Sequence, residues 1–182
     1  MSPLNKVLLS VGLIAATSCV AQDLSGRKVV SLGNAAGDRI AIGQVEFTPT
    51  SPGRYRFAFV LDESRFSEYF LAMRPFKCLT GPTQRLCHFP YGEDDEISLD
   101  DLSALEYRLM FLRTKPNATH VDPRQGLYYR LTRSGNGLAG EVFEVDMDPI
   151  ITPQGDRRRP IGARHLEPVD PGTQWLPLVK VE

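Results

Sequence analysis

Fifteen glycines and fourteen prolines divide this chain of 182 residues into many short segments. Short segments bounded by turn residues are typical of a sheet-rich domain. The clearest segment is Tyr55–Leu61, in which large apolar residues at 55, 57, 59 and 61 alternate with Arg56 and Ala58. Strict alternation is the pattern of a half-buried antiparallel strand, so the chain is expected to build much of its core from such strands.

Further strands are expected on both sides of the Gly/Pro turns. Arg27–Leu32 and Arg39–Phe47 flank one turn, and the apolar residues of the second segment change phase at Gly43, which indicates a β-bulge. Thr48–Gly53 is expected to be a loop. Leu176–Val181 is expected to be a closing strand, and its proline confines it to a sheet edge or to the start of the strand.

One more hairpin is expected from Leu127–Arg133 and Leu138–Met147, joined by glycine-rich residues at 135–137. A three-residue loop with a left-handed glycine at its end places Tyr129 opposite Phe143. This register separates apolar from polar side chains best, so we prefer it.

Two segments follow the helical period instead. Residues 62–73 combine a capping Asp62 with an apolar stripe at Phe66, Tyr69, Phe70 and Met73. From residue 98 on, Ser98 and Asp101 have the spacing of a capping box, and a stripe continues through Leu102, Leu105, Leu109 and Leu112 until Pro116. Two short helices are therefore predicted.

The first 21 residues have the order of a secretory leader. Lys6 gives a positive start, Val7–Thr17 is an apolar run, and small residues close the segment at Ala21. The run is about half the length that a membrane-spanning helix needs. We therefore expect cleavage after Ala21 and a mature protein that is periplasmic or secreted. The alternative is a bacterial lipoprotein, anchored to a membrane through a lipidated Cys19.

Cys78 and Cys87 remain after either cleavage, and an even pair outside the cytosol predicts a disulfide. Phe76–Thr80 and Arg85–Phe89 are expected to pair as strands around a four-residue loop. This register places the two cysteines directly opposite each other, where Cβ atoms lie about 4.5–5.5 Å apart. The spacing is wider than the C-x-x-C of redox pairs, and zinc would need two more ligands, so a structural disulfide is preferred.

Length and composition describe an ordinary globular protein. Residues 22–182 are expected to form a single domain, since a chain of this size can bury a core of its own. The leader carries Lys6 and no acid, so its removal changes the formal net charge from −1 to −2. A slightly acidic chain argues against nucleic-acid binding, which needs a basic face.

Carboxylates gather in two places. One group could hold Ca²⁺, an ion found outside cells, although it lacks EF-hand spacing and also fits a solvated loop before a helix. It consists of Glu93, Asp94, Asp95 and Glu96. The second group, Glu144, Asp146 and Asp148, alternates along a strand. Acid–base chemistry and a plain solvent-facing row are its two interpretations.

Two further sets are candidates for ligand binding. An aromatic ligand surface is expected where the strand of Tyr55 and Phe57 meets that of Tyr129 and Phe143, although these residues also fit the core. The basic run Arg157, Arg158 and Arg159 suits an anion or an exposed loop.

Motifs of known chemistry are absent from the sequence. His88, His120 and His165 are far apart and belong to no metal or triad pattern. Asn117-Ala118-Thr119 is an N-glycosylation sequon, which has meaning only in a eukaryotic host.

Together these observations predict an α+β domain: an antiparallel sheet, flat or curled, with two short helices packed on it and one hairpin disulfide. The expected role is non-catalytic, binding or structural, toward a protein or a small apolar ligand. One alternative is a small hydrolase that uses carboxylates and a histidine. Another is an inhibitor or assembly partner that presents the disulfide hairpin.

Overall fold

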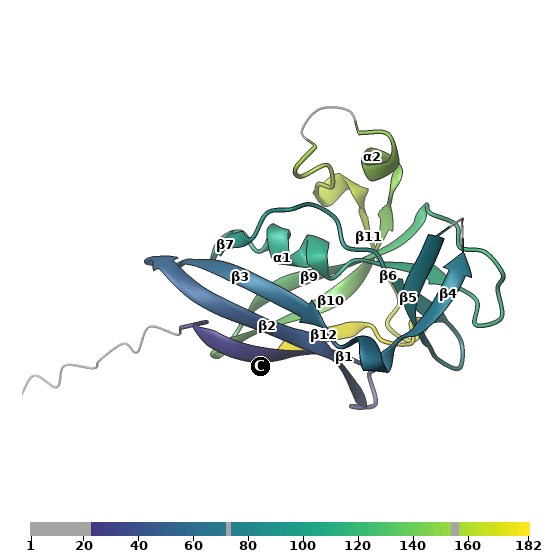
Figure 1. Cartoon of the computed structure of the whole chain (residues 1–182), viewed down its shortest axis with the longest axis horizontal. Helices are drawn as coiled ribbons and strands as arrows, with labels where there is room; N and C mark the ends of the chain where they lie inside the picture. Colours follow the sequence, from purple (N-terminus) through teal and green to yellow (C-terminus); the bar gives the residue numbers. More distant parts are fainter. Residues whose placement is uncertain (1–22, 72–73, 154–156) are drawn as a thin grey trace, which may run out of the picture.

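A computed structural model describes residues 23–71, 74–153 and 157–182, and antiparallel strands dominate it (Figure 1). The strands are β1 (Gly26–Gly33), β2 (Arg39–Ser51), β3 (Arg54–Leu61), β4 (Ser67–Leu71), β5 (Arg74–Thr80), β6 (Arg85–His88), β7 (Glu96–Ser98), β8 (Phe111–Thr114), β9 (Gln125–Ser134), β10 (Gly137–Asp146), β11 (Leu166–Pro168) and β12 (Leu178–Val181). The helices are short: α1 (Ser103–Arg108), α2 (Asp148–Ile151) and the 3₁₀ turns η1 (Glu63–Arg65) and η2 (Ala163–His165). The expected antiparallel sheet with two small helices is confirmed, with less helix than an α+β description implies.

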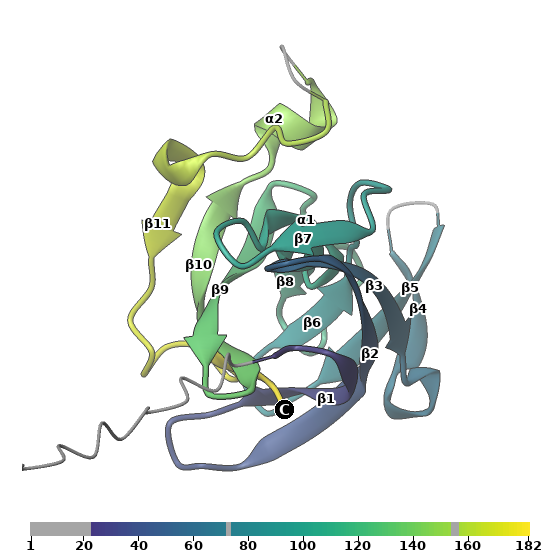
Figure 2. The ribbon, with the colours of Figure 1, turned by 90° about the vertical axis from the view of Figure 1, so that its left-hand side faces the viewer.

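The described strands belong to one sheet in the order β4-β5-β6-β8-β9-β10-β12-β1-β2-β3-β7, with β11 beside β10. Strand β12 pairs with both β1 and β10, so it joins the N-terminal strands to the rest of the sheet. The sheet curls around its inner face without closing (Figure 2). Helix α1 contacts β3, β7 and β9, and thereby bridges two parts of the sheet that do not pair.

The inner face of the curled sheet encloses the larger apolar cluster. Its largest fully buried side chains include Phe47 from β2, Phe111 from β8 and Tyr129 from β9. The rings of Phe111 and Tyr129 meet edge to face, with centroids 6.1 Å apart. Burying each large apolar side chain contributes about 1.5–3 kcal/mol, so this cluster stabilises the folded sheet substantially.

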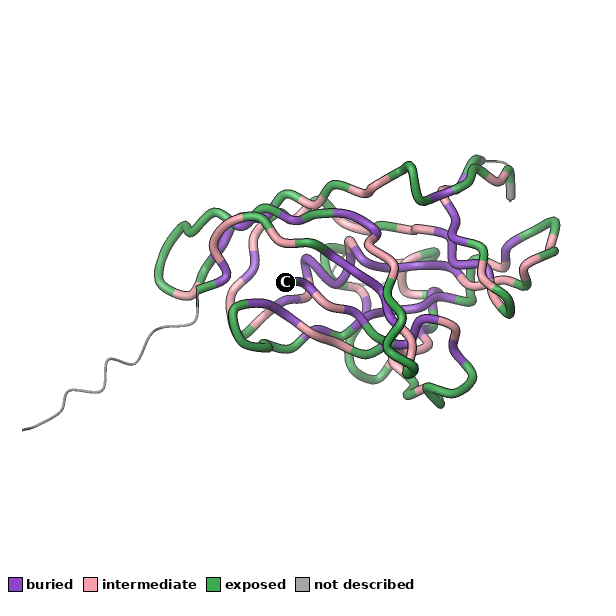
Figure 3. Tube along the Cα trace, turned by 90° about the horizontal axis from the view of Figure 1, so that it is seen from below, coloured by how far each residue is buried: buried purple, intermediate pink, exposed green. Residues whose placement is uncertain are grey.

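A second apolar cluster covers the outer face of β5, β6, β8, β9 and β10. Cys78 and Cys87 lie directly opposite each other there and form a disulfide, as predicted. Strands β5 and β6 also have the predicted register, with Thr80 opposite Arg85. Val121 and Ile161, from segments outside the strands, belong to the same buried cluster. Buried stretches therefore run through much of the trace, while the loops at its ends are exposed (Figure 3).

Most of the N-terminal strand predictions are confirmed. Strands β1, β2 and β3 occupy the expected segments, and the register of β1 with β2 shifts so that Ile42 is the extra residue beside Gly43. The predicted loop Thr48–Gly53 is wrong in part, because β2 continues to Ser51 and pairs with β3. The closing strand β12 begins directly after Pro177. Proline has no backbone N–H to donate, so it is tolerated in this position just before the paired residues.

The predicted helix over 62–73 is wrong. Asp62 does cap a helical turn, since its carboxylate accepts a hydrogen bond from the Ser64 backbone N–H at 3.2 Å, but only η1 forms. The chain then continues as β4, which pairs with β5. Pairing with a neighbouring strand satisfies the backbone and overrides the helical spacing of Phe66 and Tyr69. Met73 lies outside the described residues.

The second predicted helix is too long. Helix α1 covers only Ser103–Arg108, and Leu112 belongs to β8. Ser98 does not cap the helix, because it pairs with Asp101 in an isolated bridge. The Asp101 carboxylate instead accepts a hydrogen bond from the Ser103 backbone N–H at 3.1 Å.

The predicted register of the β9–β10 hairpin is wrong by one residue. Ser134 pairs with Gly137, so the loop has two residues and Tyr129 faces Val142 instead of Phe143. The positive φ of 58° belongs to Gly135. The prediction chose the register that best separates apolar from polar side chains. That criterion fails here because both faces of the hairpin are buried: Tyr129 lies in the inner cluster and Tyr128 in the outer cluster.

The predicted leader, the cleavage after Ala21 and the lipidation alternative at Cys19 all lie outside the described residues.

Candidate functional site

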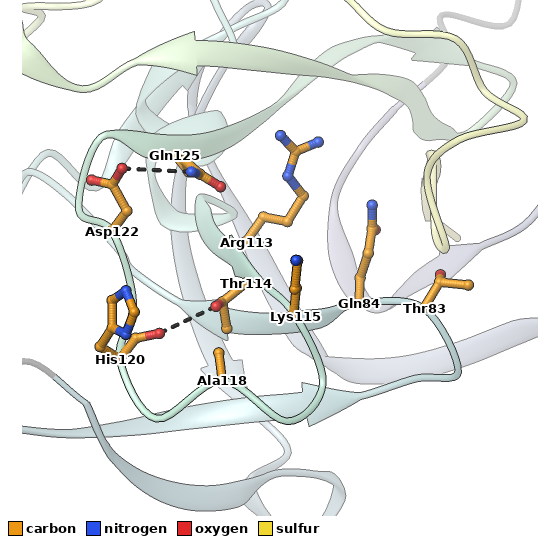
Figure 4. A pocket seen from close by; sticks show the side chains of 9 residues that line it. All are labelled: Thr83, Gln84, Arg113, Thr114, Lys115, Ala118, His120, Asp122 and Gln125. Atoms are coloured by element: carbon orange, nitrogen blue, oxygen red, sulfur yellow. Dashed lines mark hydrogen bonds between the residues drawn. The ribbon is translucent and has the colours of Figure 1, made fainter.

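An open pocket of about 500 Å³ lies where β8 ends and the chain loops back toward β9 (Figure 4). The turn before β6 contributes Thr83 and Gln84, and the end of β8 contributes Arg113, Thr114 and Lys115. The returning loop contributes Ala118, His120 and Asp122, and the start of β9 contributes Gln125. Sheet-end residues and a loop therefore form its walls together.

The extended backbone at the end of β8 places two cations on one side of the chain. Arg113 and Lys115 are two residues apart, a spacing that points side chains to the same face of a strand. Figure 4 shows both side chains, together with Gln84, reaching in the same direction. Thr114 points the other way and its hydroxyl donates a hydrogen bond to the His120 carbonyl at 3.2 Å, which ties the loop to the strand.

Arg113 belongs to a polar network beside the pocket. Its Nη1 lies 2.6 Å from Oε1 of Glu144, and the Gln174 side-chain amide donates to the same oxygen at 3.4 Å. Gln174 is buried, and its Oε1 has no hydrogen-bond partner among the described residues. The Lys115 side chain is exposed and forms neither an ion pair nor a hydrogen bond within the described part of the chain, while its carbonyl accepts from the Ala118 backbone N–H at 3.1 Å.

A buried arginine holds the loop in place. Arg85 is only 6% exposed, and its Nη1 donates to the Ala118 carbonyl at 3.0 Å while its Nη2 donates to the Pro116 carbonyl. Its guanidinium also lies over the Tyr69 ring, 3.7 Å from the centroid. No carboxylate neutralises this cation in the described structure, so carbonyl oxygens and an aromatic face stabilise it.

The strap formed by residues 173–176 supports the opposite wall. The side-chain amide of Gln84 donates to the Thr173 carbonyl at 3.2 Å, and its oxygen accepts from the Trp175 backbone N–H at 3.1 Å. The Trp175 ring lies so close to Gly81 that a Cβ at that position would collide with it. Gln84 is thus fixed by the strap and shapes the pocket wall.

Replacing Arg85 tests how far the loop depends on it. We expect Arg85→Met to destabilise the protein by about 2–4 kcal/mol, because two loop carbonyls lose their donor and the contact with Tyr69 is lost. Amide hydrogen exchange over residues 115–125 should accelerate in Arg85→Met. Arg85→Lys, which keeps the charge but not the forked donors, should be intermediate. Unchanged exchange in both variants would show that the loop is held by other contacts.

The predicted aromatic ligand residues are not brought to this pocket. Tyr55, Phe57 and Tyr129 are buried in the inner cluster. The Tyr129 hydroxyl donates to the Leu176 carbonyl at 2.7 Å, which anchors the strap. Phe143 lies on the other face and lines a separate groove over β9, β10 and β12.

The basic run also lies elsewhere. Arg157, Arg158 and Arg159 are exposed in the loop before η2. Arg159 pairs with Asp101, and the Arg157 carbonyl accepts a hydrogen bond from the Tyr91 hydroxyl at 2.7 Å. These contacts fasten the loop to the region of α1.

The predicted calcium ligands are spread along the chain before β7. Asp95 and Glu96 both pair with Arg56, at 3.4 and 3.5 Å. Glu93 is exposed and Asp94 is half-buried. Within residues 23–71, 74–153 and 157–182, no three His, Cys, Asp or Glu side chains are arranged to hold a metal ion.

The three histidines occupy different elements. His88 is held by the Arg108 carbonyl, 2.8 Å from Nε2, and burial lowers the pKa of this imidazole. His120 lines the pocket, and the Nδ1 of His165 accepts from the Gly162 backbone N–H at 2.9 Å. In the second carboxylate group, Glu144 pairs with Arg113 and Asp148 pairs with Arg124.

The residues that build the pocket were missed as site residues in the sequence. Arg113 and Lys115 look like the basic end of a helix, an interpretation that the shorter α1 removes. One feature of the sequence could have indicated them: the two cations are spaced two residues apart in an extended segment directly before Pro116. The sequon residue Asn117 is exposed in the same loop, beside Ala118 of the pocket.

No protein-family model, no curated protein and no solved structure matches this chain. Neither α1 nor any other helix of the described residues has the length and apolar content that crossing a bilayer requires.

Proposed function

We propose that this chain is a non-catalytic binding protein that works outside the cytoplasm and holds a small polar ligand in the pocket at the end of β8. The observation that carries the proposal is the pocket itself, about 500 Å³ in volume and lined by cationic, amide and hydroxyl side chains. A volume of this size is in the range of small-molecule sites.

A polar ligand is favoured over the apolar one expected from the sequence. The inner face of the sheet is filled by side chains such as Phe47, Phe111 and Tyr129, all at most 1% exposed. Apolar ligands need an apolar cavity, whereas the walls here offer hydrogen-bonding and charged groups. The Cys78–Cys87 disulfide supports an oxidising compartment, where such bonds persist.

The two alternatives have less support. A hydrolase needs an acid or base beside a nucleophile or water. The rings of His88 and His165 are bonded to backbone groups in separate elements, and the His120 ring has no hydrogen-bond partner among the described residues. A partner that presents the hairpin would need a freely projecting loop. Here Pro82 and Thr83 are exposed, but Gly81 packs against the Trp175 ring and Gln84 is bonded to the strap.

The proposal is tested by NMR titration of the oxidised chain with N-acetylglucosamine, citrate and glucose 6-phosphate. At least one probe should shift the backbone amides of Thr114, Lys115, Ala118 and Asp122 saturably. Ala118→Trp should abolish those shifts, because an indole in place of the methyl group fills the pocket. Shifts confined to the groove beside Phe143, or shifts that survive Ala118→Trp, would contradict the proposed site.

A further inference from the structure

The polar groups in and beside the pocket divide into acceptors that already have hydrogen-bond partners and donors that are largely free of them. The carboxylates in and beside the pocket already accept hydrogen bonds: Asp122 accepts from the Arg124 backbone N–H at 2.9 Å, and Glu144 accepts from Arg113 and Gln174. The Gln84 side-chain oxygen accepts from Trp175. A ligand that arrives with donors therefore finds few acceptors among these groups.

The donors, by contrast, remain open. The Lys115 ammonium carries three N–H donors and has no partner among the described residues. The Arg113 guanidinium has five donors, and Glu144 is its one described partner. The His120 ring is exposed, and only its backbone carbonyl is bonded within the described part of the chain.

The charge balance agrees with this inventory. Arg113 and Lys115 line the pocket, and the buried cation of Arg85 touches the Ala118 carbonyl behind it. Two carboxylates, Asp122 and Glu144, oppose these three cations. A local positive excess on a chain of net charge −1 is a feature that attracts anions.

From open donors, engaged acceptors and excess positive charge, we infer that the ligand of this pocket is a small anion that presents a carboxylate or phosphate group to Lys115 and Arg113. This inference rests on the proposed function and names its ligand class. Glu144 competes for Arg113, so it tunes the affinity of the site.

The test uses citrate and inorganic phosphate as probes, with sodium chloride at matched ionic strength and neutral N-acetylglucosamine as references. Dissociation constants are measured from the shifts of the pocket amides in the oxidised chain. Lys115→Gln should weaken binding of the anions about three- to fivefold, the effect of one partly exposed ion pair. Lys28→Gln on β1, which removes a lysine far from the pocket lining, should leave binding unchanged.

Glu144→Gln gives the opposite sign and separates ligand binding from folding. The amide oxygen still accepts from Arg113, but the competing charge is gone, so both anions should bind about two- to fivefold more tightly. A loss of folding cannot produce tighter binding.

The outcomes are distinct. Equal shifts with chloride at the same ionic strength, or anion affinities unchanged in both variants, would overturn the inference. Saturable binding of N-acetylglucosamine without citrate or phosphate would also overturn it and leave the proposed binding function standing. If no probe shifts the pocket amides, both the anion inference and the proposed binding function are wrong.

Discussion

Glu106→Ala is expected to destabilise the protein by about 2–5 kcal/mol, because it leaves two buried donors without an acceptor. Glu106 lies in α1 and is 7% exposed. One of its oxygens accepts from the Tyr128 hydroxyl at 2.5 Å and the other from the Leu131 backbone N–H at 2.6 Å. The carboxylate thus satisfies the edge of β9 along which β8 no longer pairs, while the other edge of β9 pairs with β10. Urea unfolding monitored by circular dichroism measures the loss.

Glu106→Gln is the matched control. An amide can accept from Leu131 through its oxygen and donate to the Tyr128 hydroxyl oxygen through its nitrogen, so both contacts survive. We expect a loss below about 1.5 kcal/mol, the net value of a typical hydrogen bond. A Gln variant as unstable as the Ala variant would show that the charge, and not the hydrogen bonding, is what matters here.

The same pair of proteins predicts a pH dependence. Burial raises the pKa of Glu106 above its usual 4.5, so the folded chain keeps this proton to a higher pH than the unfolded chain. The stability that protonated Glu106 contributes to the folded protein is therefore fully present below pH 4.5 and is lost as the pH rises through the raised pKa. As the pH rises through this range, Glu106→Gln should lose less stability than the parent protein, because its amide does not titrate. If the free energies of unfolding of the parent and of Glu106→Gln changed in parallel with pH, Glu106 would not be the source of this pH dependence.

The second large effect concerns the disulfide. Replacing both Cys78 and Cys87 by Ala is expected to cost about 2.7 kcal/mol in the chain-entropy model for a ten-residue loop. Both residues are at most 1% exposed in the outer cluster, so loss of their sulfur contacts adds to this figure. The midpoint of urea unfolding should fall accordingly.

A reductant provides the control for that variant. The parent unfolded in dithiothreitol should approach the midpoint of the double variant, while the variant itself should not respond to dithiothreitol. Equal midpoints for the oxidised and reduced parent would contradict a stabilising disulfide. Because the sulfurs are buried, reduction should need opening of the β5–β6 region and proceed slowly in the native protein.

Sequence reasoning was most accurate where one face of a strand meets solvent. In β3, Tyr55 and Phe57 are buried while Arg54 and Arg56 are exposed, so the alternation gives both the strand and its orientation. The cysteine hairpin was equally predictable, since its loop length sets the register that places Cys78 opposite Cys87.

It failed where the sheet is buried on both sides. Tyr128 and Tyr129 are consecutive and both buried, so apolar pattern does not distinguish the two registers of the β9–β10 hairpin. Leu109 and Leu112 have helical spacing, yet Leu112 pairs with Cys87 and Gly126 as part of β8. Strand partners distant in sequence decided the local structure there.

Local patterns of turn residues, alternation and cysteine spacing determined that the chain is an antiparallel sheet protein with a hairpin disulfide, because these features act between residues close in sequence. The curl, the second buried face and the pocket were decided only in three dimensions. Arg85, Arg113 and Lys115 meet the 116–125 loop because β6 pairs with β8, and Glu144 reaches Arg113 across 31 residues of chain. Contacts of that kind depend on which strands become neighbours, and no local pattern of residues contains that choice.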